Sequence, residues 1–497
     1  MALRRVLSVI ALLSATAAGA QMSSPSPQPD AFAARNRLFV LTDIGNEPDD
    51  QMSFVRLLLY ANEIDIEGVA ATTSQHLRDK LHDDTLHRIV AAYGAVRPSL
   101  VKHAPGWPTA AALDRAITTG PVRFGMAGID PAMPSPGALA LIAAADRPDE
   151  RPLWVSIWGG ANTLAEALSV VRRTRDKPAL DRLVAKLRVY AISDQDDAGQ
   201  WLRREFPALQ YVVSPSGSPE DYALATWTGI SGDRFYGNDV DAADGSRIAH
   251  DWLEANIRKG PLGSLYPKVE YIMEGDTPSF LGLTANGLAS AMSPAWGGWG
   301  GRYVYRQPYG ESRPIWTQGG MMLYDANSRD RVVGRDGQIA RSDQATIWRW
   351  RNAFQHDFAA RIDWTIKPFV EANHQPRARI AGQPDLGPIV IAAKAGEPVT
   401  LDAGPSTDPD RGQTLHYRWS PYREAGARLS ALADVTIAGA DSPRATLTAP
   451  AACRRAVPFM DVPCKAGEAH VILEISDDGT PALTTYRRIV LRVSPST

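Results

Sequence analysis

Four carboxylates lie close together in the stretch Thr-Asp-Ile-Gly-Asn-Glu-Pro-Asp-Asp, which ends at Asp50. Asp43, Glu47, Asp49 and Asp50 repel one another unless a positive charge lies among them. Hard oxygen ligands of this kind suit Ca²⁺, and Mg²⁺ is the second candidate. Proline at a helix start and aspartates in its first turn also belong to ordinary helix capping. The stretch therefore predicts a metal or catalytic site, and the alternative is a capped, solubilising helix start.

The elements around this stretch predict where it lies in the fold. An apolar run, Leu38 to Leu41, predicts a buried strand before it, and an apolar-periodic helix runs from Pro48 to about Asn62. Strands that alternate with helices predict an α/β fold with a mainly parallel sheet flanked by helices. Such folds keep their sites at the carboxyl ends of the strands. Further buried strands are expected at 66–74, 153–160, 187–193 and 209–213.

Two later polar stretches could meet the first one at that edge. Gln195 and Asp196 follow a predicted strand and could hold substrate hydroxyls, although this acidic turn could equally cap the next helix. Asp276 is a candidate metal ligand, and its alternative role is an N-cap ahead of Pro278. We expect these side chains to gather near Asp43 if the site is real.

A Gly- and Trp-rich segment offers a candidate binding wall. Trp296 and Trp299 alternate with pairs of glycines, which let the backbone approach a ligand closely. The two tryptophans could contact a sugar, and the alternative is a Gly-rich loop packed on the sheet. The chain holds 13 Trp in all, most of which we expect in the core.

The composition and the two ends of the sequence limit the class of protein. Hydrophobic residues make up 44% and the formal net charge is −2, which is ordinary for a globular chain and argues against nucleic acid or an anionic membrane as partner. Residues 1–20 resemble a signal peptide, with an uncleaved anchor as the alternative, and no later segment is apolar enough to span a membrane. A secreted or periplasmic location follows, and it permits a disulfide between Cys453 and Cys464.

The pattern changes after residue 372 and divides the chain. We expect a disordered start at 21–35, the α/β domain at 36–372 and a Pro-rich linker at 373–388. Short alternating strands over 389–497 predict a β-sandwich with Trp419 in its core.

The first domain resembles the nucleoside hydrolases and, more closely, the nucleoside hydrolase-like domain of bacterial secreted "cellulose-binding" proteins. The stretch from Thr42 to Asp50 is similar to the Asp-x-Gly-x-Asp-Asp signature of the hydrolases, with two residues inserted. The stretches that begin at Ser193, Glu274 and Trp296 match the second group. That group also carries an Ig-like C-terminal domain with the Ser-Thr-Asp-Pro-Asp turn found here at 406–410.

The resemblance implies roles for individual residues. Asp43 and Asp50 would be Ca²⁺ ligands, and Asp43 would also be the base that deprotonates the attacking water. Asp49 would bind sugar hydroxyls, the backbone carbonyl of Asn162 would be a further ligand, and Asp276 would close the site. The hydrolases place a His, the leaving-group acid, just before that last Asp. Here Glu274 and Gly275 stand before it, so Glu274 is the candidate acid.

The function that follows is a secreted, metal-dependent glycosidic hydrolase acting on a small nucleoside-like or saccharide substrate. An N-glycosyl, ribosyl-type bond would break through a cationic sugar stabilised by the carboxylates. Two alternatives remain open. One is a carbohydrate-binding protein without turnover, which would use Trp296, Trp299 and the sandwich and could bind a polysaccharide such as cellulose. The other is an O-glycoside hydrolase that acts on cell-wall or plant saccharides.

Overall fold

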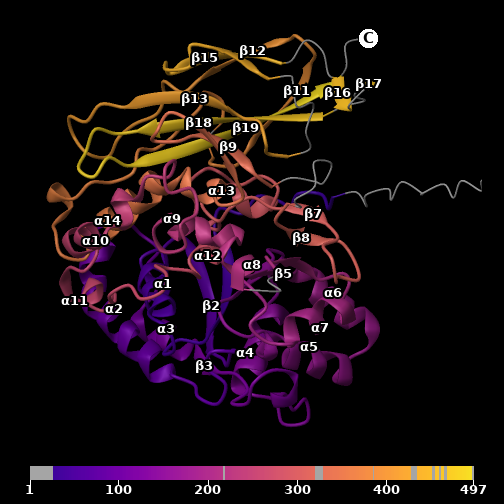
Figure 1. Cartoon of the computed structure of the whole chain (residues 1–497). Helices are drawn as coiled ribbons and strands as arrows, with labels where there is room; N and C mark the ends of the chain where they lie inside the picture. Colours follow the sequence, from indigo (N-terminus) through magenta and orange to yellow (C-terminus); the bar gives the residue numbers. More distant parts are fainter. Residues whose placement is uncertain are drawn as a thin grey trace, which may run out of the picture.

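An eight-stranded sheet forms the centre of the first part of the molecule, and a β-sandwich packs on one end of it (Figure 1). The computed structural model describes residues 26–215, 219–319, 328–383, 385–426, 434–449, 454–457, 460–463 and 467–494. The expected signal peptide and the expected disulfide between Cys453 and Cys464 lie outside these residues. No helix within the described ranges is long and apolar enough to cross a membrane.

The large sheet is parallel apart from one edge strand. Its strand order is β3-β2-β1-β4-β5-β6-β8-β7, and only the pair β7–β8 is antiparallel. The expected α/β fold is therefore confirmed. The strands are β1 (Asn36–Thr42), β2 (Ile64–Ala71), β3 (Ile117–Thr119), β4 (Leu153–Ile157), β5 (Leu187–Ala191), β6 (Gln210–Val212), β7 (Val304–Arg306) and β8 (Ile315–Thr317).

Strand β1 is apolar along its length because both faces of the sheet are covered. Leu38 and Val40 enter the core on one face, and Phe39 and Leu41 enter the core on the other. The first face is covered by α1 (Pro48–Leu58), α2 (Asp83–His103) and α14 (Arg351–Trp364), and the second by α4 (Pro136–Asp146), α5 (Asn162–Thr174), α6 (Lys177–Lys186) and α7 (Ala198–Glu205).

The chain changes direction across the sheet between β1 and β4. From β1 it first builds β2 and β3 on one side, and it then returns to place β4, β5 and β6 on the other side. In open parallel sheets the carboxyl ends of the strands form a crevice at this switch point, and ligands bind there. The acidic stretch that begins at Asp43 follows β1 directly and therefore lies at this crevice.

Short elements fill the segment between β6 and α14. They contribute no further strand to the middle of the large sheet, but they carry the second half of the candidate site. The elements used below are α8 (Pro219–Ala223), α12 (Pro278–Leu281), α13 (Ala345–Trp348) and the hairpin of β9 (Asp330–Val333) and β10 (Ile339–Ser342).

The C-terminal part is a two-sheet sandwich, as expected. One sheet has the order β11-β19-β18-β13, the other β12-β15-β14, and Trp419 is 2% exposed in the core between them. The strands are β11 (Ile389–Lys394), β12 (Pro398–Asp402), β13 (His416–Tyr422), β14 (Thr436–Ala438), β15 (Arg444–Thr448), β18 (Gly467–Ser476) and β19 (Thr484–Ser494), with a separate hairpin of β16 (Arg454–Val457) and β17 (Met460–Pro463).

The segments expected to be linker and disordered start make specific contacts where they are described. In the linker, Asn373 is buried and donates to Asp477 in the turn before β19, at 3.0 Å. At the start, Asp30 forms an ion pair with Arg188 at 2.6 Å. Neither segment forms a helix or a strand before β1 and β11, but both are attached to the folded parts by polar contacts.

Candidate functional site

Four buried aspartates from distant parts of the chain meet at the carboxyl end of β1. Oxygen atoms of Asp49, Asp50 and Asp276 all lie within 4.8 Å of one another. Asp43 adjoins them through a hydrogen bond with Asp50 and also accepts one from Ser74, beyond the end of β2. We call Asp43, Asp49, Asp50 and Asp276 the acidic cluster. The expectation that Asp276 reaches the first acidic turn is confirmed.

The local sequence explains the first three positions of the acidic cluster. The Thr42 hydroxyl at the end of β1 donates to Asp50, and it accepts a hydrogen bond from the backbone N–H of Ile44 at 3.1 Å. Pro48 begins α1, so that Asp49 and Asp50 occupy the first turn of that helix. Helix capping therefore accounts for part of the acidity, as the alternative interpretation held, but it does not account for Asp43.

Asp276 is held in place by its neighbour Glu274. One carboxylate oxygen of Glu274 accepts from Arg56 of α1 at 2.6 Å, and the other accepts from the Tyr266 hydroxyl at 2.8 Å. Glu274 is fully buried, with a φ of 55°. Both of its oxygens are therefore occupied by structural partners. The expected role of Glu274 as leaving-group acid has no support in this arrangement.

Two glycines allow the backbone to approach the acidic cluster closely. A Cβ atom on Gly275 would lie 2.7 Å from Oδ2 of Asp49, and a Cβ atom on Gly159 would lie 2.7 Å from Oδ1 of Asp43. Both distances are shorter than real side chains allow. Backbone from the end of β4 and from the segment before α12 thus lies directly against the carboxylates.

Burial raises the pKa of every member of the acidic cluster, and repulsion between carboxylates adds to this for Asp49, Asp50 and Asp276. Burial raises the pKa of Asp49 to about 8, and the charges of Glu47 and Asp43 add to this. Burial and then the neighbouring aspartates raise the pKa of Asp50 and of Asp276 well above the usual range. Burial also raises the pKa of Asp43, where nearby His76 acts in the opposite direction.

The donor set fits a hard divalent cation. Oδ2 of Asp276 is buried and has no hydrogen-bond partner among the described residues. Charges that act on Asp276 from Asp50, Asp49, Asp43 and Glu47 are all negative. A cation would satisfy the free oxygen and remove the repulsion, and carboxylate oxygens are the ligands that Ca²⁺ and Mg²⁺ prefer. Asp49, which was expected to bind sugar hydroxyls, lies among the candidate ligands instead.

Two predicted site residues follow the ends of β4 and β5, namely Asn162 and Asp196. Asn162 donates from its side chain to Thr73 at 3.0 Å and accepts from Thr72 at 2.8 Å, so its amide is used internally. Asp196 accepts from the backbone N–H groups of Asn162 and Ala198, both at 3.0 Å, and fixes the starts of α5 and α7. The helix-capping alternative therefore describes Asp196, and a carbonyl ligand from Asn162 stays a prediction.

Gln195 keeps one free polar atom near the site. Its side-chain nitrogen donates to the carbonyl oxygen of Trp158 at 2.5 Å, and its Oε1 is buried without a partner among the described residues. This leaves an acceptor for a substrate hydroxyl. The predicted substrate contact of Gln195 is compatible with this geometry.

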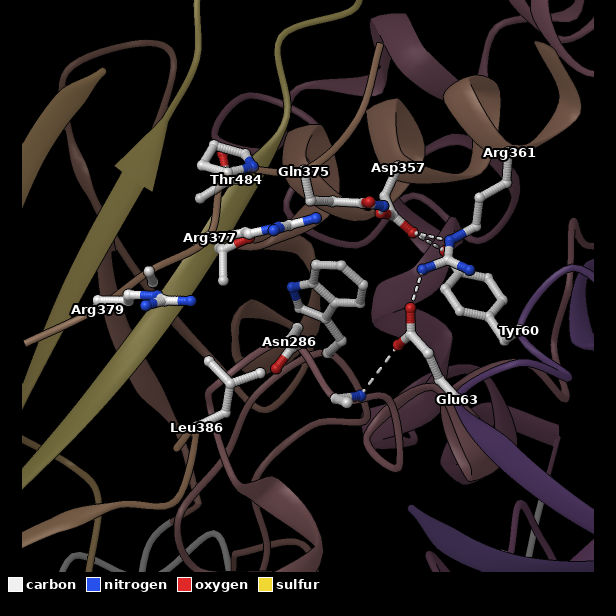
Figure 2. Close-up of a pocket in the computed structure, with 15 residues that line it drawn as sticks. Tyr60, Glu63, Asn286, Asp357, Arg361, Gln375, Arg377, Arg379, Leu386 and Thr484 are labelled. Atoms are coloured by element: carbon white, nitrogen blue, oxygen red, sulfur yellow. Dashed lines mark hydrogen bonds and ion pairs between the residues drawn. The ribbon is translucent and has the colours of Figure 1, made fainter. Parts of the chain in front are cut away.

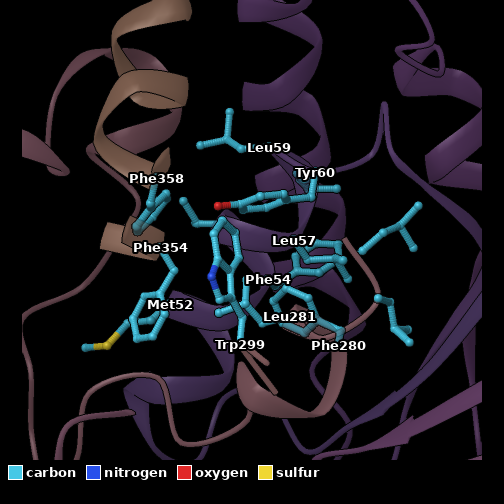
Figure 3. Close-up of a cluster of buried hydrophobic side chains, with 14 of the residues drawn as sticks. Met52, Phe54, Leu57, Leu59, Tyr60, Phe280, Leu281, Trp299, Phe354 and Phe358 are labelled. Atoms are coloured by element: carbon cyan, nitrogen blue, oxygen red, sulfur yellow. The ribbon is translucent and has the colours of Figure 1, made fainter. Parts of the chain in front are cut away.

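The two candidate tryptophans lie elsewhere, at the junction with the sandwich. Trp299 is 2% exposed and packs with Phe354 and Phe358 of α14 in an apolar cluster (Figure 3). Trp296 is 4% exposed and lies edge-on to His470 of β18, with ring centroids 5.3 Å apart. Neither presents a face at the acidic cluster, so the alternative of a packed Gly-rich segment describes them better.

Sequence analysis missed an aromatic group beside Asp49. The negative charge of Asp49 raises the pKa of Tyr222 and of Tyr236, after burial as the main cause, so both hydroxyls lie near the carboxylate. Tyr222 also packs on Trp227, with ring centroids 5.0 Å apart. Both tyrosines are partly exposed. They come from the segment after β6, where the sequence shows no clear periodicity that could have identified them.

Comparisons with known proteins agree with this architecture. Residues 37–303 match the model "Cellulose-binding Sde182, nucleoside hydrolase-like domain", and residues 398–493 match "Cellulose-binding protein Sde0182, C-terminal domain". The solved structure of a nucleoside hydrolase-related hypothetical protein from Saccharophagus degradans, associated with carbohydrate metabolism, is 33% identical. It covers 93% of this chain and 100% of its own, with a TM-score of 0.75.

The other comparisons add nothing to the assignment. The PKD domain from the KIAA 1837 protein is 18% identical and covers 22% of this chain and 84% of its own. Its TM-score is 0.15, so it carries no argument about the fold. No curated protein matches the chain.

Proposed function

Because the chain belongs to the family of cellulose-binding Sde182 proteins with a nucleoside hydrolase-like domain, we propose that its acidic cluster is the active site of a cation-dependent glycosidic hydrolase. The bond cleaved is an N-glycosyl bond of the ribosyl type. The observation that carries this proposal is the approach of Asp49, Asp50 and Asp276 to within 4.8 Å at the switch point of the sheet. Helix capping alone would not require this accumulation of buried negative charge.

The residues of this chain have separate tasks in the proposed reaction. Asp49, Asp50 and Asp276 would hold the divalent cation. When bound, such a cation lowers the pKa of a water molecule and orients it toward the anomeric carbon. Asp43, which adjoins Asp50 and whose own pKa is raised by burial, would accept the proton from the attacking water. The surrounding carboxylates would stabilise the positive charge that develops on the sugar ring.

Groups near the acidic cluster would orient the substrate. The free Oε1 of Gln195 can accept a hydrogen bond from a sugar hydroxyl. Tyr222 and Tyr236 lie near Asp49, where aromatic rings can pack on a sugar or a leaving group. Since Glu274 is held by Arg56 and Tyr266, a leaving group that departs without protonation should react most readily.

A second candidate function is carbohydrate binding without turnover. Glu274 is held by structural hydrogen bonds and is not free to act as an acid, and the family description names cellulose binding, so both favour this function. In that case the acidic cluster would hold a structural cation, and the sugar, which could be cellulose, would bind elsewhere on a secreted or periplasmic protein. An O-glycoside hydrolase that uses the same acidic cluster is a third possibility, which the same experiment separates.

The test is hydrolysis by the purified protein of nitrophenyl riboside, nucleosides, nitrophenyl glucoside and oligosaccharides, with Ca²⁺ or with EDTA. Cation-dependent release from the ribosyl substrates supports the proposal. Release from the glucoside alone supports an O-glycosidase. No release from any substrate, together with retention on cellulose, supports the binding function. Asp276→Asn serves as the inactive control, and Asp181→Asn on exposed α6 as the matched surface control.

A further inference from the structure

A cavity of about 350 Å³ lies at the junction of the α/β part and the sandwich (Figure 2). Its walls come from the turn after α1, from the segment 285–299, from α14, from the segment before β11 and from the start of β19. No member of the acidic cluster lines it. Its volume is in the range of small-molecule sites, which often form between domains.

The two carboxylates of the cavity wall, Glu63 and Asp357, already have hydrogen-bond donors. Arg361 pairs with Glu63 and donates to Oδ2 of Asp357 at 2.9 Å (Figure 2). Tyr60 also donates to Oδ2 of Asp357, at 2.6 Å, and Gln375 donates to Oδ1. The second oxygen of Glu63 accepts from a backbone N–H of the neighbouring loop at 3.1 Å. Each of the four carboxylate oxygens therefore already has a hydrogen-bond donor.

The donor groups of the same cavity are free. Arg377 and Arg379 are exposed at the opening of the cavity, no acceptor among the described residues is bonded to their guanidinium groups, and both side chains extend toward the cavity in Figure 2. Trp299 also lines the cavity, but it is 2% exposed and its buried Nε1–H lies against the Tyr486 hydroxyl, so it offers no donor to a ligand. Asn286 accepts from Leu288 through its side-chain oxygen, and its amide N–H groups have no acceptor among the described residues.

The presence of unbonded donors and of already bonded carboxylates indicates which kind of ligand fits the cavity. A neutral glucan offers hydroxyls that donate as well as accept, and the wall has no free carboxylate to receive them. An anion with many acceptor oxygens matches the free donors, because paired guanidinium groups bind carboxylates with charge-assisted hydrogen bonds. The free groups carry two positive charges and no negative charge.

We infer that the interdomain cavity binds a carboxylate-bearing sugar, the uronic-acid residue of an oligosaccharide. Arg377 and Arg379 would bind the carboxylate, and the amide N–H groups of Asn286 would donate to ring or hydroxyl oxygens. The anionic part of this inference stands on the cavity alone, and its sugar part rests on the carbohydrate association proposed above. Turnover at the acidic cluster is not required.

The test is calorimetric titration of the whole protein with a glucuronate-containing disaccharide, with cellobiose and with inorganic phosphate. We expect binding of the uronate that weakens with added salt, and affinities at least tenfold lower for cellobiose and for phosphate. The double variant Arg377→Gln/Arg379→Gln should lower the uronate affinity by roughly tenfold or more. The variant Arg377→Lys/Arg379→Lys keeps the charge, and its uronate affinity should lie between those of wild type and the double Gln variant.

Two controls make the outcome decisive. Arg444→Gln removes an exposed arginine of β15 that also lacks a partner in the described residues, and it should leave uronate binding unchanged. Asp276→Asn should abolish hydrolysis and leave uronate binding intact, which separates this site from the acidic cluster. Equal binding of cellobiose or phosphate, no binding of the uronate, or undiminished binding by the double Gln variant would each overturn the inference.

Discussion

The carboxylate of Glu274 lies 2.6 Å from the guanidinium of Arg56, and both side chains are completely buried. Arg56 also donates to the side chain of Gln355 at 2.9 Å and to the carbonyl oxygen of Phe354 at 2.7 Å. The ion pair thus joins α1, α14 and the segment that carries Asp276. It positions one member of the acidic cluster against two others, which lie on α1.

Removing one side of this ion pair should destabilise the protein strongly. Glu274→Ala leaves the Arg56 charge buried without its partner, and we expect a loss of about 3–5 kcal/mol in the free energy of unfolding. Urea denaturation measures it. Ala substitution of Lys177, which forms an exposed pair with Asp181 on α6, should change the stability by less than about 0.5 kcal/mol.

The same ion pair separates two roles for Glu274. Glu274→Gln keeps the side-chain shape but cannot donate a proton as an acid. If activity falls while the stability and the Ca²⁺ affinity stay at wild-type values, Glu274 is a leaving-group acid after all. We expect the stability to fall instead, because the Arg56 charge again lacks a counter-charge.

Neutralising a carboxylate of the acidic cluster should weaken cation binding strongly without unfolding the protein. Asp50→Asn and Asp276→Asn each remove a candidate ligand, and we expect Ca²⁺ affinity to fall on the order of 100-fold. In the absence of the cation, both variants should be at least as stable as wild type at pH 7, because a buried like charge is gone. Calorimetric titration and thermal unfolding in EDTA test the two parts. Unchanged Ca²⁺ titration curves would contradict the assignment.

Gly275→Ala should disturb the acidic cluster through shape alone. The added methyl would lie 2.7 Å from Oδ2 of Asp49 and 3.0 Å from the Trp227 ring, so Asp49 must move. We expect weaker Ca²⁺ binding, roughly tenfold, with a circular dichroism spectrum like that of wild type. Gly310→Ala is the control for cation binding, because an added methyl there meets no atom and cation binding should be unaffected. Its positive φ makes it unsuitable as a control for stability.

The contribution of His470 to the stability of the protein should fall as the pH drops below about 6.5. Burial lowers the pKa of His470 to about 4 in the folded state, and Arg488 lies 3.0 Å from its Nδ1. The unfolded chain therefore binds a proton at a higher pH than the folded one. The stabilisation that His470 contributes is complete above about pH 6.5 and is lost toward pH 4, by up to about 3 kcal/mol.

The measurement for His470 is the difference between two proteins. Unfolding free energies of wild type and His470→Gln are compared from pH 7 to pH 4, so that other titrating groups cancel. Relative to His470→Gln, wild type should lose unfolding free energy as the pH falls from 7 to 4. Parallel curves would mean that the buried imidazole does not control this part of the pH profile.

Local sequence determined the central strands and the start of the site. The apolar run before Asp43 and the proline that opens α1 place three aspartates at the end of β1, because strand burial and helix initiation depend on neighbouring residues. The alternating pattern around Trp419 predicted the sandwich for the same reason. Short elements such as β3 and the antiparallel edge strand β7 were not predicted, since three residues carry too little pattern.

Only the tertiary structure decided which distant residues join the site. Asp276 and Glu274 are two positions apart, yet one faces the acidic cluster and the other faces Arg56. Trp299 has the type and setting of a sugar contact, but packing against α14 buries it. The direction of a side chain depends on the partners that packing brings to it, and these partners lie far away in the sequence.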